Sequence, residues 1–157
     1  MMSVAAPSQG ELRDLYRELI LDHARNPRHF GKLEAATHRA DGINPLCGDK
    51  LKLYLCIDAE ETIVDASFEG SGCAISIASA SLLTEIVIGM SARQALEHVA
   101  AVVAALTGRT ERIAVDLGKL EALQGVKEFP SRVKCATLAW HALNAAIDNK
   151  MGPATTE

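Results

Sequence analysis

Residues 50–57 of the chain run Lys50-Leu51-Lys52-Leu53-Tyr54-Leu55-Cys56-Ile57. Polar and apolar side chains alternate along this stretch. Because successive side chains of a strand point to opposite faces, the pattern predicts a strand with one buried face. A second strand is expected over 62–69, after an acidic turn at 58–61, and a weaker strand over 37–43. These segments predict a three-stranded antiparallel sheet with one apolar face.

The hydrophobic period changes after the second strand. Residues 74–88 have the length of a helix and almost no charge before Glu85, which predicts a helix that is buried on most sides. Ser91 is a suitable N-cap for a helix that runs to about residue 106. Two further helices are expected over 11–25 and from 130 to about 149. The interval 109–130 is irregular and charged, with a short helical turn at 119–124.

The order of these elements predicts an α+β domain with helices packed on one face of the sheet. The chain has 157 residues, of which 48% are apolar, enough to form one hydrophobic core. We expect a single domain over 11–150, between a disordered N-terminal arm at 1–10 and a disordered tail at 151–157.

The charge distribution excludes several classes of partner. The net charge is -4 and no run of lysines or arginines forms a stripe, which argues against nucleic acid and anionic membranes. No segment has the roughly 20 continuous apolar residues of a membrane span, and the N-terminus lacks a signal-peptide pattern. We therefore expect a cytoplasmic protein, in which reduced cysteines act as ligands, nucleophiles or core residues.

Three of the four cysteines lie in loops or at helix starts. Cys47 and Asp49 bracket Gly48 on a tight turn, and a thiolate and a carboxylate so placed can converge on one cation. Cys73 precedes the buried helix, whose N-terminus favours a thiolate. Cys135 follows Arg132 and Lys134 in the first turns of the last helix. A turn or core role remains open for each of these cysteines taken alone.

The remaining candidate ligands do not form a site. Cys56 belongs to the polar face of the strand at 50–57, so we exclude it. The histidines show no pair at ligand spacing, and we expect surface or helix-end positions for His23, His29, His38, His98 and His141.

Three motifs closely resemble the SufU branch of the IscU/NifU-like family. They are Asn44-Pro45-Leu46-Cys47-Gly48-Asp49, the stretch 70–81 around Cys73, and Phe129-Pro130-Ser131-Arg132-Val133-Lys134-Cys135. The segments 22–28 and 117–126 resemble that branch as well, so that the likeness runs from about residue 12 to 148.

The resemblance implies a fold, a site and a partner. The fold is the IscU-like (SufE/NifU-type) α+β sandwich. The implied zinc ligands are Cys47, Asp49, Cys73 and Cys135. In the wider family the three cysteine positions also hold a nascent [2Fe–2S] cluster. The implied partner is a pyridoxal-phosphate-dependent cysteine desulfurase of the SufS type, with a downstream cluster scaffold as a further candidate recipient.

One departure distinguishes the branches of this family. Lys134 stands where scaffold members of the IscU type have histidine before the third cysteine, and this favours a zinc-dependent sulfur acceptor of iron–sulfur cluster assembly. We predict that Cys47 accepts persulfide sulfur, with Cys135 as the second candidate, and that Arg132 and Lys134 offset the charge of the thiolates. A [2Fe–2S] scaffold and a non-catalytic zinc module are the alternatives. The expected role is that of a zinc-dependent, sulfurtransferase-like accessory protein of the desulfurase.

Overall fold

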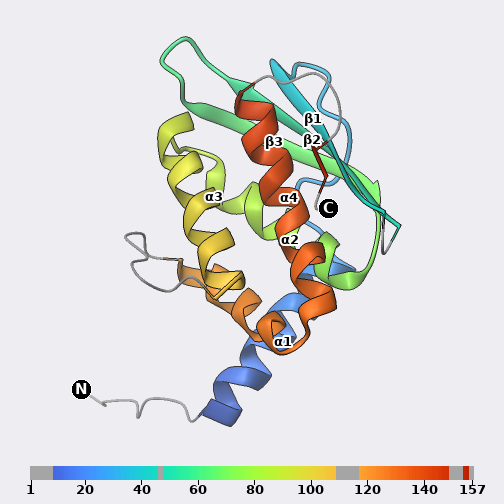
Figure 1. The fold of residues 1–157 in the computed structure, drawn as a ribbon. Coiled ribbons are helices and arrows are strands. Elements are labelled where there is room, and N and C mark those ends of the chain that lie inside the picture. Colours follow the sequence, from blue (N-terminus) through green and yellow to red (C-terminus); the bar gives the residue numbers. More distant parts are fainter. Residues whose placement is uncertain (1–8, 46–47, 109–116, 149–153, 156–157) are drawn as a thin grey trace, which may run out of the picture.

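The computed structural model describes residues 9–45, 48–108, 117–148 and 154–155. The elements in chain order are α1 (Gln9–Arg25), β1 (His38–Asn44), β2 (Asp49–Ile57), β3 (Ile63–Ser71), α2 (Ala74–Val87), α3 (Ala92–Leu106), the 3-10 helix η1 (Gly118–Glu128), α4 (Pro130–Ile147) and β4 (Ala154–Thr155). Each predicted strand and helix is present within a few residues of its expected bounds. The prediction of an α+β fold with an antiparallel sheet and helices on one face is confirmed (Figure 1).

The sheet has the strand order β3-β2-β1-β4. β2 pairs antiparallel with both β1 and β3, as the alternating pattern predicts. The short strand β4 adds a parallel pairing to β1 at Gly42 and Ile43, and it lies within the tail 151–157, where no strand was expected. Two residues are too few to show a period-two pattern, so the sequence carries no signal for this pairing.

The helices pack in two layers against the sheet (Figure 1). α4 contacts β1 and β2, α2 contacts β3, and α3 packs on α4. Trp140 of α4 is fully buried, and its indole N–H donates to Ser79 Oγ of α2 at 3.1 Å. Ser79 Oγ in turn donates to the Ala136 carbonyl at 2.6 Å. These hydrogen bonds hold α2 against α4, and they therefore fix the relative positions of the N-terminal turns of the two helices.

α3 begins with the cap that the sequence predicts. The Ser91 hydroxyl accepts the Gln94 backbone N–H, and the Gln94 side chain accepts the Ser91 backbone N–H, which completes a capping box.

Tyr54 differs from expectation, because it belongs to the polar face of β2 but is only 4% exposed. Its hydroxyl donates to Glu69 of β3, and burial together with this carboxylate raises the pKa of Tyr54 to about 12.

α1 packs on α2 and η1, and a buried histidine lies where it ends. His23 is in the last turn of α1, as expected of a helix-end residue, but it is 1% exposed. Its Nδ1 is 2.7 Å from Ser81 Oγ, and its Nε2 is 3.4 Å from Glu85 Oε1. Glu85 Oε1 accepts no hydrogen bond within the described part of the chain, so Ser81 is the hydrogen-bond partner of the ring and Glu85 is a carboxylate at ion-pair distance. We refer to His23, Ser81 and Glu85 as the α1–α2 junction.

Candidate metal centre

The ends of β1 and β2 bring Asn44 and Asp49 together at one edge of the fold. These two residues are direct partners in the antiparallel register, and the Gly48 backbone N–H closes the connection by donating to the Asn44 carbonyl at 2.9 Å. Asp49 is fully buried, with its side chain on the helix side of the sheet and next to the start of α2. Among the described residues, no lysine, arginine or histidine nitrogen lies within 4.0 Å of its carboxylate.

Cys73 is the N-cap residue of α2, directly after β3. Its backbone N–H donates to Asp49 Oδ1 at 2.9 Å, so the carboxylate also lies in the field of the helix N-terminus. Gly72 makes this approach possible. A Cβ at this position would lie 2.6 Å from Asp49 Oδ1 and 2.5 Å from Ser76 Oγ, closer than real Cβ atoms come.

Cys135 reaches the same place from α4. Pro130 occupies the first turn of that helix, where its missing N–H costs no hydrogen bond, and Cys135 follows in the second turn. Its side chain is fully buried, and its Sγ lies 3.7 Å from Asn44 Nδ2 at the end of β1. The three positions therefore come from a strand start, a helix N-cap and a helix interior, which all lie in well-packed parts of the fold.

One donor atom from each of Asp49, Cys73 and Cys135 lies within 4.8 Å of the other two. Tetrahedral zinc ligands at 2.0–2.3 Å from the ion are roughly 3.3 to 3.8 Å apart, so a closure of about 1 Å would suffice. Two thiols and a buried carboxylate that has no cation partner among the described residues are also a chemically suitable donor set. This group is able to bind a metal, and the residues fit a zinc ion.

Comparisons with known proteins agree with this geometry. Residues 15–136 match the family model described as the NifU-like N terminal domain. The chain belongs to the NifU-like family. The prediction of a SufU-type member of the IscU/NifU-like family is thereby confirmed.

Two curated relatives and one crystal structure illustrate the likeness of this NifU-like domain. It is 42% identical to the "Zinc-dependent sulfurtransferase SufU" of Bacillus subtilis, over 90% of this chain and 95% of that one. It is 40% identical to the "Iron-sulfur cluster assembly scaffold protein IscU" of Streptococcus pyogenes, over 87% and 85%. A candidate SUF-system assembly scaffold from Fervidobacterium islandicum superimposes with a TM-score of 0.75 at 35% identity, over 83% of this chain and 94% of that one.

The structure of the NifU-like domain places the other predicted site residues as follows. Cys47 lies outside the described residues, so its part in the centre stays a prediction. Arg132 is exposed and Lys134 is half-buried, both within three residues of Cys135 on α4. Cys56 is partly exposed and pairs across the sheet with Asp65. It is not part of the metal-binding group, in accord with its exclusion from the sequence pattern.

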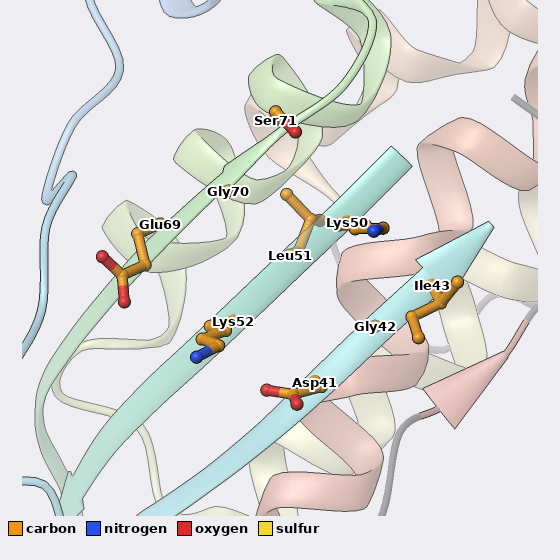
Figure 2. Close-up of a pocket in the computed structure, with 9 residues that line it drawn as sticks. All are labelled: Asp41, Gly42, Ile43, Lys50, Leu51, Lys52, Glu69, Gly70 and Ser71. Atoms are coloured by element: carbon orange, nitrogen blue, oxygen red, sulfur yellow. The ribbon is translucent and has the colours of Figure 1, made fainter. Parts of the chain in front are cut away.

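A groove of about 390 Å³ lies on the outer face of the sheet, which faces away from the helices (Figure 2). Lys52 lies in register between Asp41 and Glu69, while Lys50 lies between Ile43 and Ser71. The charges of the two lysines and of the Asp41 and Glu69 carboxylates balance. The groove therefore has no net charge that would attract an ion. Period-two alternation points Lys50 outward and Asp49 inward, and the groove is therefore separate from the metal centre.

Two polar residues near the centre are not singled out by the sequence. Asn44 contacts both Asp49 and Cys135, and Ser76 Oγ is 3.8 Å from Cys73 Sγ. Ser76 also donates to the Cys73 carbonyl at 3.0 Å. Asn44 lies in the quoted motif, where asparagine before proline is an ordinary turn signal. Its burial at the end of β1 is the property that distinguishes it, and burial depends on the strand register.

Proposed function

We propose that this NifU-like domain is a zinc-binding sulfur acceptor of iron–sulfur cluster assembly. It receives sulfur from a pyridoxal-phosphate-dependent cysteine desulfurase of the SufS type. The observation that carries the proposal is the convergence of Asp49, Cys73 and Cys135 within 4.8 Å. The Bacillus subtilis relative matches nearly the whole chain, and its name, zinc-dependent sulfurtransferase, supports both the metal and the reaction.

The donor set suits a reactive centre. Zinc has no redox chemistry, and when bound it holds thiols as thiolates without oxidising them. A carboxylate is a harder ligand than a thiolate, and structural zinc sites are usually built from cysteine and histidine alone. With Cys47 as the fourth ligand, the centre would comprise three thiolates and the Asp49 carboxylate. Such a set favours a site in which one thiolate exchanges.

Cys47 is the proposed acceptor. Its thiolate attacks the outer sulfur of the desulfurase persulfide, a new S–S bond forms on Cys47, and the desulfurase cysteine leaves as a thiolate. Sulfur moves with no net oxidation or reduction. Cys135 is the second candidate, but its full burial requires that the site open before it can react. Cys73, which is partly exposed, is more accessible than Cys135.

The substitution Cys47→Ser tests this assignment. We expect the variant to accept no persulfide from a desulfurase charged with cysteine, while it keeps much of its zinc through the three remaining ligands. Cys56→Ser is the matched control, because Cys56 lies on the outer side of the sheet, and it should accept sulfur as the unmodified protein does. Mass spectrometry after alkylation measures the added sulfur. Normal persulfide formation on the Cys47→Ser variant would refute the role of Cys47.

A [2Fe–2S] scaffold is the second candidate function. It is favoured by the 40% identity to the Streptococcus pyogenes protein, which is named as an assembly scaffold. The same three cysteines would then hold the cluster. Anaerobic reconstitution distinguishes the two functions: a stable cluster that transfers to an acceptor protein would favour the scaffold. One tightly bound zinc with stimulation of a desulfurase favours sulfur acceptance.

The setting of this reaction is part of the proposal. No helix within the described part of the chain is long and apolar enough to cross a bilayer. We propose that the protein works in the cytoplasm, where thiols remain reduced, and passes its sulfur to a downstream cluster scaffold.

A further inference from the structure

Asn44 occupies a position that links the sheet to the metal centre. It is the last residue of β1 and the direct partner of Asp49 in the register. Its side chain is fully buried. Its carbonyl accepts the Gly48 N–H, so the same residue also fixes one end of the connection between the two strands. A buried amide at such a place needs partners for its polar atoms.

The Asn44 amide nitrogen faces two of the candidate ligands. Nδ2 is 3.4 Å from Asp49 Oδ2 and 3.7 Å from Cys135 Sγ. Both are acceptors, and an amide nitrogen carries two N–H groups, so one nitrogen can donate to both. This orientation follows from the chemistry, because the amide oxygen would be repelled by a carboxylate and a thiolate. Oδ1 is buried and has no hydrogen-bond partner within the described part of the chain.

We infer that Asn44 is a positioning residue, which holds Asp49 and Cys135 in place as one fixed edge of the metal centre. The inference rests on the proposed metal centre and adds to it. The two N–H groups set the separation of an oxygen ligand and a sulfur ligand that come from different elements. They also draw negative charge away from both anions. This stabilises the centre, because its ligands together carry more negative charge than the metal ion neutralises.

Cys73 is held differently. It is partly exposed, and within the described part of the chain its sulfur has one polar contact, the 3.8 Å approach to Ser76 Oγ. Asp49 and Cys135 are both fully buried and share the Asn44 amide. Asp49 and Cys135 therefore form a fixed edge of the centre, and Cys73 lies outside that edge. Ligand exchange during sulfur acceptance would leave this edge in place, so that the Asn44 edge retains the ion.

Substitution of Asn44 tests the inference, with Co²⁺ as a spectroscopic probe for zinc. Asn44→Ala removes the amide, and Asn44→Leu removes it but keeps a branched side chain with the same number of heavy atoms, so that a cavity does not explain a shared effect. We expect both variants to bind Co²⁺ and Zn²⁺ about 10- to 100-fold more weakly in chelator competition, as is typical when a partner of a metal ligand is lost. Loss of the N–H···S bond raises the energy of the sulfur lone pairs, so the sulfur-to-cobalt charge-transfer band should move to longer wavelength.

Ser81→Ala is the control for a merely structural effect. Ser81 is a buried polar residue that hydrogen-bonds to His23 and to the Arg28 N–H, away from the cysteines. The Ser81→Ala variant should have a lower thermal stability in the metal-free form, while its metal affinity and cobalt spectrum remain unchanged. Wild-type affinity and spectrum in both Asn44 variants would overturn the inference. Failure of the unmodified protein to bind either metal would instead overturn the metal centre itself.

Discussion

Two clusters of buried polar side chains differ in whether their carboxylate has a cation nearby. At the α1–α2 junction, His23 faces Ser81 and Glu85 with its two ring nitrogens. Glu85 is partly exposed, and its Oε1 accepts no hydrogen bond within the described residues but lies 3.8 Å from Lys119 Nζ. At the metal centre, the buried Asp49 carboxylate has no cation within 4.0 Å among the described residues, and Asn44 Oδ1 has no partner there.

The difference separates a structural cluster from a functional one. A carboxylate with a cation at ion-pair distance has its charge compensated by the protein alone, and its cluster contributes to stability. A buried carboxylate beside two thiols is costly in the protein alone and becomes favourable when a cation binds. Substitution at the first cluster should therefore change stability, and substitution at the second should change metal binding.

Asp49→Asn should give the largest effect in this comparison. The amide keeps an oxygen that can accept the Cys73 N–H, but it removes the negative charge and a good metal ligand. We expect zinc affinity to fall by at least about 100-fold, beyond the loss typical of a partner outside the ligand set. The metal-free variant should be as stable as the unmodified protein or more stable, because an unpaired buried charge is gone.

Chelator competition and thermal unfolding of the metal-free form measure these two quantities. A variant that retains full zinc affinity would show that Asp49 is not a ligand. A large loss of stability in the metal-free form would show instead that Asp49 mainly stabilises the fold.

His23→Gln should give a smaller effect, on stability and its pH dependence. We expect a loss of about 1 kcal/mol from weaker hydrogen bonding, with zinc affinity unchanged. Burial lowers the pKa of His23 below its usual 6.5; the Arg28 charge acts in the same direction, and Glu85 and Asp22 oppose it. Lys119 adds to the lowering.

The sign of the pH effect follows from this direction. The unfolded chain binds the His23 proton more readily, so stability falls as the pH drops below 6.5 towards the lowered folded pKa. His23→Gln should reduce this slope, measured by denaturant unfolding of the metal-free protein between about pH 5 and 7.5. Burial also lowers the pKa of His141, which should account for a remaining slope. An unaltered slope in the variant would contradict the neutral, buried His23.

Much of the fold could be predicted because its elements have strong periods. The alternation over 50–57 predicts β2 and its buried face, and the apolar run after Cys73 predicts α2. The burial of His23 and Tyr54 could not be predicted, since it depends on which elements pack beside them rather than on their own neighbours in sequence. The two-residue strand β4 is too short to carry a pattern.

The candidate site was predicted in its residue types but not in its internal arrangement. Cysteine in a glycine turn, at a helix start and beside basic residues indicates thiolates that could bind metal, and the family resemblance joins these positions into one site. The contact of Asn44 with Asp49 and Cys135 depends on the β1–β2 register and on the place of α4, and neither follows from local sequence. The side chain that positions the ligands therefore becomes visible only in the folded chain.

X-ray absorption at the zinc edge tests the central claim most directly, on full-length protein purified without chelators and loaded with one equivalent of zinc. We predict four ligands, with three sulfurs at about 2.3 Å and one oxygen at about 2.0 Å. One sulfur should be lost in the Cys135→Ser variant. A shell of oxygen and nitrogen alone, or a spectrum that Cys135→Ser leaves unchanged, would contradict the account.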